Sequence, residues 1–296
     1  MIHYFSFRAW GELQKRTNNT VVALSIGTHL AERELSRAGL GERRAPEVLA
    51  NIARADRLDV TAAKAREVFR STASDLAFLA IPQIAATHIE LMVGTLEECE
   101  AFPGIVKPHK KGLAVKDWNA ADLRKAIRFG EQPTNADRLI EFCVKLRNSI
   151  MHGVGRVDPG LVAVWENLPA AAKARWESLA GRSFTYERLH ARPSLAWGEV
   201  KATLAVTKES AAEINARMER ILTRDQWAAL IVHDYRRVSP RRFHSSSPGK
   251  LVRDGSDAGT RRTERALLRL HSHAGAYYHP LAITLDELHA ARERVV

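Results

Sequence analysis

The chain has 296 residues, of which 45% are hydrophobic and 27% are charged. This length suits two compact domains better than one, since domains cluster near about 100 to 150 residues, and the proportions exclude a wholly disordered chain. The net charge of +11 favours a nucleic-acid partner, because phosphates attract Lys and Arg. The two cysteines, Cys99 and Cys143, lie in apolar stretches, so we expect buried core residues in a reducing compartment rather than a disulfide.

The sequence also predicts where the protein resides. Its opening segment, MIHYFSFRAW, lacks the basic start and following apolar run of a secretory signal. The longest apolar stretch, residues 76–93, is interrupted by Pro82, His88 and Glu90, and we expect it to be too polar to span a membrane. We therefore expect a cytoplasmic protein that does not associate with a membrane.

The first half of the chain predicts three kinds of segment. Residues 1–59 mix Ala, Leu, Glu and Arg, which favours short helices in a peripheral N-terminal region. From residue 61 to about 102, apolar residues recur three and four positions apart, which predicts one long helix, or two collinear helices that meet at Pro82. Residues 102–118 are rich in Pro, Gly and Lys and are typical of a basic connector.

The next elements are also predicted to be helical. A short helix is expected over 120–129, followed by a longer one that Asn135 caps and that ends near Gly153. Further helices are expected over 170–180, 208–222 and 260–272, with a loop over 239–256, and a strand near 195–206 stays open. The predicted fold is mainly α, with a helical region over 1–59, a helical bundle over 60–160 and a basic, mostly helical domain of unknown fold over 161–296.

The segment LRNSIMHG, residues 146–153, carries the clearest chemical signal. On a helix, Asn148 and His152 lie one turn apart on the same face, and Arg147 flanks that face. Histidine can move protons near neutral pH, and arginine offers a charged fork to phosphate oxygens. These groups suit RNA cleavage in which the ribose 2′-hydroxyl attacks the adjacent phosphate without a metal or cofactor. We predict His152 as the proton-transfer group, Arg147 as the phosphate clamp and Asn148 as the positioning residue.

Two other Arg–His pairs have a similar spacing, Arg237 with His244 and Arg265 with His271, but neither has Asn after Arg. The alternative interpretation of the 146–153 segment is an ordinary helix end, where His152 complements the helix dipole and Arg147 is a solvated charge.

The segment resembles the catalytic motif of the HEPN superfamily, helical bundles whose active members carry Arg, a polar residue and then His. The resemblance covers about residues 60–160. It implies an endoribonuclease that acts on RNA as a homodimer, with the motifs of two chains facing each other. It also implies a toxin, abortive-infection or antiviral-defence role, with an antitoxin or another defence-system protein as partner. The family includes inactive members. Val154 stands where some HEPN toxins have a tyrosine that their antitoxin modifies, which argues against that regulation.

A basic segment near the C-terminus predicts a second nucleic-acid contact. Its alternative interpretation is a solvated loop with ion pairs. The basic segment also supports an alternative function for the whole chain, a non-catalytic nucleic-acid-binding or regulatory dimer. The residues predicted to bind nucleic acid are Arg236, Arg237, Arg241, Arg242, Lys250, Arg253, Arg261 and Arg262.

Two further clusters are not expected to carry chemistry. His271, His273 and His279 have no thiolate or well-spaced carboxylate beside them, so no metal site is predicted. The acidic run of Glu97, Glu98 and Glu100 is interpreted as a solvated helix surface.

Overall fold

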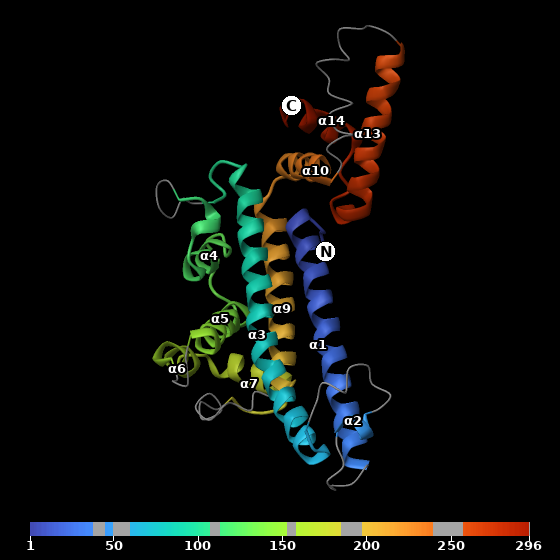
Figure 1. Ribbon diagram of the computed structural model, residues 1–296. Helices are drawn as coiled ribbons and strands as arrows, with labels where there is room; N and C mark the ends of the chain where they lie inside the picture. Colours follow the sequence, from blue (N-terminus) through green and yellow to red (C-terminus); the bar gives the residue numbers. More distant parts are fainter. Residues whose placement is uncertain are drawn as a thin grey trace. The chain divides into compact units, whose positions relative to one another are not determined.

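The computed structural model describes residues 1–37, 45–49, 60–106, 113–152, 158–184, 197–238 and 257–295. Within these ranges every regular element is a helix, which confirms the mainly α class (Figure 1). Residues 197–206, where a strand was left open, are helical. The α-helices are α1 (Phe5–Arg37), α2 (Ala45–Val48), α3 (Ala62–Glu100), α4 (Ala120–Ala126), α5 (Asn135–His152), α6 (Pro159–Glu166), α7 (Ala170–Ala180), α9 (Trp197–Ile221), α10 (Arg224–Val238), α13 (Asp257–Tyr277) and α14 (Leu285–Val295), with 3₁₀ turns η2 (Val115–Asp117) and η3 (His279–Leu281).

The chain forms two compact units, each assembled from segments that are distant in the sequence. The first unit contains Met1–Gly11, Glu90–Gln132 and Ala211–Val296, and the second contains Glu12–Ile89 and Pro133–Ser210. Helices α1, α3 and α9 therefore contribute residues to both units. The consecutive domains over 1–59, 60–160 and 161–296 stay a prediction.

The N-terminal expectation is wrong, because one helix of 33 residues, α1, replaces the short peripheral helices. Its first turns are part of the core of the first unit, where Tyr4 and Phe7 are buried and the Tyr4 hydroxyl lies 3.0 Å from Thr95 Oγ1. Further along, Val21, Ala31 and Leu35 are buried in the second unit. Exposed apolar residues, among them Leu13, Leu24 and Ile26, lie between the buried ones and obscure the apolar spacing of the helix in the sequence.

Helix α3 is continuous over 39 residues and contains Pro82, which agrees with the single long helix allowed by the sequence. The sequence was expected to be too polar in this region to span a membrane. By length and composition, however, the segment Leu76–Glu100 could cross one, so that expectation is wrong on these two measures. More than half of the tested segment is buried inside the protein, and buried core helices pass the same test. Cytoplasmic location stays a prediction.

The shorter predicted helices agree with the structure. The helix predicted over 120–129 is α4, which Asn119 caps by accepting from two backbone N–H groups, and the chain leaves it through Gly130 at a φ of 91°. The helices predicted over 170–180, 208–222 and 260–272 coincide with α7, the second half of α9 and most of α13. Gly153 and the loop over 239–256 lie outside the described residues. Both cysteines are buried and free, as expected.

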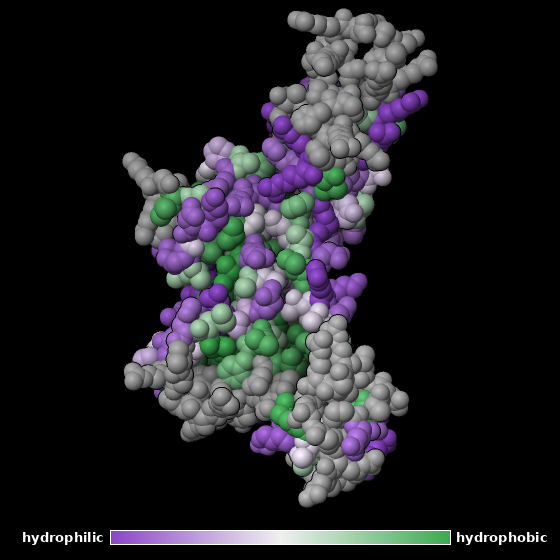
Figure 2. Space-filling model, in the orientation of Figure 1, coloured by the Kyte–Doolittle hydropathy of each residue, from purple (hydrophilic) through white to green (hydrophobic). Residues whose placement is uncertain are grey.

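An apolar groove of about 390 Å³ lies in the second unit between α1 and α3. Its walls include Val21 and Leu24 from α1 and Leu79 from α3. Leu24 and Leu79 are 49% and 71% exposed. Figure 2 shows hydrophobic residues, in green, in patches both above and below the middle of the face in view.

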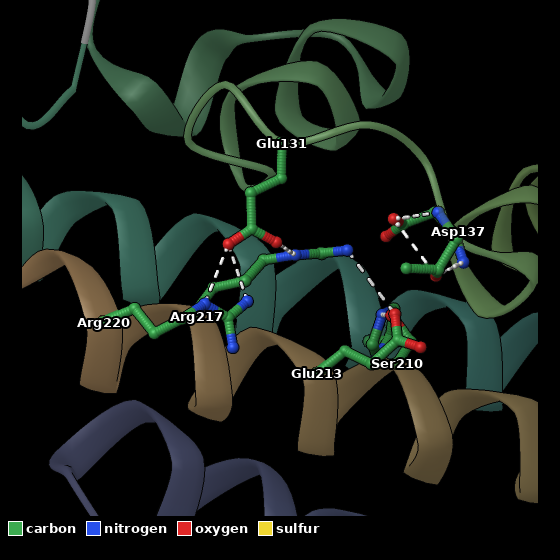
Figure 3. Close-up of polar contacts among 8 residues, drawn as sticks. Glu131, Asp137, Ser210, Glu213, Arg217 and Arg220 are labelled. Atoms are coloured by element: carbon green, nitrogen blue, oxygen red, sulfur yellow. Dashed lines mark hydrogen bonds and ion pairs between the residues drawn. The ribbon is translucent and has the colours of Figure 1, made fainter.

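Glu131 joins two arginines of α9 within the first unit (Figure 3). Arg217 Nε donates to one carboxylate oxygen at 3.2 Å, and Arg220 Nε donates to the other at 3.0 Å. Arg217 is almost fully buried, so this carboxylate and Glu213 offset the cost of removing its charge from water.

Asp234 on α10 is a buried charge of the first unit that contacts three side chains. Its side chain is 2% exposed and receives both Nη groups of Arg8, at 2.6 and 2.8 Å. The Tyr278 hydroxyl donates at 2.6 Å, and His273 Nε2 lies 3.3 Å away. Burial raises the pKa of Asp234, but these hydrogen bonds outweigh that effect and hold the pKa below its usual value.

We predict that Asp234→Ala lowers the free energy of unfolding by about 3–5 kcal/mol, because Arg8 and Tyr278 are left without their buried acceptor. The control is Asp225→Ala on the same helix. The Asp225 carboxylate is exposed and lies 3.5 Å from Arg294, so it contributes at most about 1 kcal/mol to stability. Chemical denaturation of the three proteins measures the difference. Equal losses in the two variants would contradict the buried role of Asp234.

Candidate functional site

The helix that carries the predicted motif, α5, is held by an aromatic cluster. Phe142 is fully buried, and its ring centroid lies 5.0 Å from that of Trp165 and 4.9 Å from those of Trp176 and Phe184. Two of these partners belong to α6 and α7, which pack on α5. Leu139, Cys143 and Leu146 are buried on the same helix with the three- and four-residue spacing of an amphipathic helix.

The start of α5 is fixed by a reciprocal cap. Thr134 Oγ1 accepts from the Asp137 N–H at 3.2 Å, and the Asp137 carboxylate accepts from the Thr134 N–H at 2.9 Å. This arrangement is a capping box with Asp in place of Glu. The prediction that Asn135 is the cap is therefore wrong by one residue, since Asn135 is the first residue of the helix.

The predicted catalytic residues lie in the last turns of α5. Arg147 and Asn148 are half-buried, and Arg147 Nη1 donates to Asn148 Oδ1 at 2.8 Å. His152 is the final residue of the helix and is exposed. The helix thus places Asn148 and His152 one turn apart, with Arg147 bonded to Asn148.

Arg147 has a second unusual feature, because its Nε–H is buried and has no hydrogen-bond partner among the described residues. A buried donor without a partner costs about 1–3 kcal/mol, and the Nε–H of Arg128 is in the same position. The guanidinium is therefore held by one bond to Asn148 and is not neutralised by a carboxylate within the part of the chain that the structure describes.

A second histidine of the second unit, His88 on α3, escaped the sequence interpretation. It is fully buried, its Nε2 lies 3.1 Å from the Ser210 hydroxyl, and burial lowers its pKa to about 4. At neutral pH His88 is uncharged. Its surroundings suit a structural role, whereas His152 is exposed to solvent.

The basic residues predicted to bind nucleic acid are only partly described. Arg237 lies 3.7 Å from Glu98 Oε1 and above the ring of Phe5, with the guanidinium carbon 5.1 Å from the ring centroid. Arg236 is exposed at the end of α10. Arg241, Arg242, Lys250 and Arg253 lie outside the described residues, and for Arg261 and Arg262 only the helical backbone of α13 is described. Their role in binding stays a prediction.

The interpretation of the acidic run as a solvated surface is wrong for Glu98. Glu97 and Glu100 are exposed, but Glu98 is 7% exposed and accepts from the Ser6 N–H at 2.9 Å and from the Ser6 hydroxyl. Burial raises the pKa of Glu98 to about 7, although the bonds from Ser6 oppose this shift. No sequence signal distinguishes Glu98 from its neighbours except its helical phase, seven residues after the buried Leu91.

The three C-terminal histidines do not form a metal site with other ligands. No group of three or more His, Cys, Asp or Glu side chains in the described ranges could hold a metal ion. His273 instead contacts Asp234, and His271 and His279 are exposed.

Comparison with protein-family models, with curated proteins and with solved structures found no match to this chain. The resemblance to HEPN ribonucleases therefore depends on the 146–153 segment and its position on α5.

We predict that Phe142→Ala destabilises the protein by about 3–5 kcal/mol, because it removes a ring that contacts three other aromatic rings. The matched control is Leu79→Ala, which removes an apolar side chain that is 71% exposed and should change stability by about 0.5 kcal/mol or less. Thermal unfolding of both variants tests the prediction. A Phe142→Ala protein as stable as the control would show that the cluster does not hold α5.

Proposed function

We propose that the chain is a metal-independent endoribonuclease of the HEPN type, with its catalytic residues at the C-terminal end of α5. The observation that carries the proposal is the local geometry of Arg147, Asn148 and His152. An incompletely bonded guanidinium is held by an amide, and an exposed imidazole follows one turn later on a helix that aromatic packing fixes.

The chemistry follows from these groups. A base removes the proton of a ribose 2′-hydroxyl, the 2′-oxygen attacks the adjacent phosphorus, and the bond from phosphorus to the 5′-oxygen breaks as an acid protonates that oxygen. His152 is the proton-transfer group. Arg147 binds the phosphate oxygens, whose negative charge increases in the transition state, and Asn148 holds the guanidinium through the bond of 2.8 Å.

The reaction needs one group that takes a proton and another that gives one, and each chain offers a single histidine in this motif. We therefore include a homodimer in the proposal, with the two copies of His152 acting as base and acid. The basic residues from Arg236 to Arg262 would contact the RNA backbone, in keeping with the net charge of +11. A toxin or antiviral-defence role, with an antitoxin or defence-system partner, follows only from the resemblance.

The test is to incubate the purified protein with RNA in the presence of EDTA. The wild type should cleave RNA and leave DNA of the same sequence intact, because DNA lacks the 2′-hydroxyl. His152→Ala should lower the rate by about 10²–10⁴-fold, and Arg147→Ala by about 10²–10³-fold.

The control is His29→Ala, which removes an exposed histidine from α1 and should leave the rate unchanged. Growth inhibition on expression, relieved by His152→Ala, provides a second readout. Cleavage that requires an added divalent metal, or a His152→Ala variant as active as wild type, would contradict the proposal.

A further inference from the structure

The apolar groove of about 390 Å³ in the second unit lies between two antiparallel helices. Its lining residues come from 13–24 of α1 and 76–83 of α3. Further along α1, Leu35 belongs to one buried cluster with Ala62 and Ala65 from the start of α3. Later residues of α1 thus lie beside earlier residues of α3. The order of the lining residues along the groove follows from this antiparallel arrangement.

The groove has a polar end and an apolar end. At the polar end, Arg16 and Thr17 of α1 lie level with Gln83 of α3, and Leu13 adds one apolar side chain just beyond them. The opposite end lies at Leu24 of α1 and the start of the α3 segment, where the lining side chains are apolar. A molecule that fits this groove therefore has a polar head and an apolar tail.

The polar end favours an anionic head. Among the described residues that line the groove, Arg16 alone carries a charge, and it forms no ion pair or hydrogen bond through its side chain within the described ranges. The neighbouring Glu12 and Lys15 are exposed, do not line the groove and have opposite charges. The Thr17 hydroxyl and the Gln83 amide can donate further hydrogen bonds. A carboxylate matches this set, because it accepts several hydrogen bonds and pairs with a guanidinium.

The size of the groove limits the length of the tail. Its volume lies within the range of about 300–1,000 Å³ that small-molecule sites occupy. Leu24 follows Arg16 by eight residues, which corresponds to about 12 Å along a helix. With carbon–carbon bonds of about 1.5 Å, an extended chain of about ten carbon atoms spans that distance. Such a tail would cover Leu24 and Leu79, which are 49% and 71% exposed, and would release the water that contacts them.

We propose that this groove binds an unbranched alkyl carboxylate of about ten carbon atoms, with the Arg16 guanidinium as the partner of the carboxylate. Thr17 and Gln83 donate to the same head, and the tail lies along α1 towards Leu24 and against Leu79. The binding site uses none of the residues of the α5 motif, so the proposal does not depend on ribonuclease activity.

The experiment titrates the full chain with decanoate at neutral pH, below the concentration at which decanoate forms micelles. Binding heat gives the affinity, and the methyl resonances of Leu24 and Leu79 in NMR spectra locate the ligand. Octanoate, which is two methylene groups shorter, should bind about tenfold more weakly. Decylammonium has a chain of the same length and the opposite charge, and it should bind at least about tenfold more weakly than decanoate, because Arg16 repels it.

Two variants at exposed positions separate the head from the tail without disturbing the core. Arg16→Gln should weaken decanoate binding by about tenfold, whereas Arg33→Gln, the same change at an exposed arginine of α1 outside the groove, should leave it unchanged. Leu79→Ala should also weaken binding by about tenfold, because it removes apolar surface from the wall. Leu30→Ala is its control, since Leu30 is 45% exposed on α1 and does not line the groove.

Three results would overturn the proposal. The first is equal affinity for decanoate and decylammonium, which would show that the head is not recognised by charge. The second is an Arg16→Gln variant that binds decanoate as tightly as wild type. The third is the absence of both binding heat and any shift of the Leu24 and Leu79 methyl resonances at millimolar decanoate. A groove that a second copy of the chain fills would give this third result.

Discussion

The packing of Phe142 against three aromatic rings is the constraint on which the candidate site depends. A short amphipathic helix does not hold its position by backbone hydrogen bonds alone, and most of its stability comes from its apolar face. With that face fixed, helical geometry determines the direction of every polar residue on α5. Arg147 then lies at the edge of the buried face, where Asn148 can bond it, and His152 extends into solvent at the helix end.

Much of the helical structure could be predicted because its signals are local. The apolar spacing in α3 outweighed Pro82, and Gly130 marked the end of the α4 region. The N-terminal helix α1 could not be predicted with equal success, since exposed apolar residues such as Leu24 and Ile26 obscure the spacing of its buried ones. The cap of α5 was misplaced by one residue because Thr134 and Asn135 are both good capping residues, and only the reciprocal bond to Asp137 decides between them.

The same distinction separates the two polar sites. Arg147, Asn148 and His152 lie within six residues on one helix, so the sequence itself brings them together. The Asp234 cluster joins Arg8, Asp234 and Tyr278, and Glu98 lines a cavity beside it. These residues are far apart in the sequence, so no local pattern predicts their contacts. In the sequence, a glutamate within an acidic run is interpreted as a surface residue. Only the tertiary structure shows that Glu98 is buried. Sequence analysis therefore identified the candidate nuclease residues and missed the buried carboxylates of the first unit.

The central claim is that the 2′-hydroxyl of RNA is the nucleophile and that the protein supplies the proton transfers. The most direct measurement is the chemistry of the product ends, determined by mass spectrometry of the cleaved RNA. The account predicts fragments that end in a 2′,3′-cyclic phosphate, paired with fragments that begin with a 5′-hydroxyl. Fragments with 3′-hydroxyl and 5′-phosphate ends would show that water attacked the phosphorus instead, and they would contradict the role assigned to Arg147 and His152.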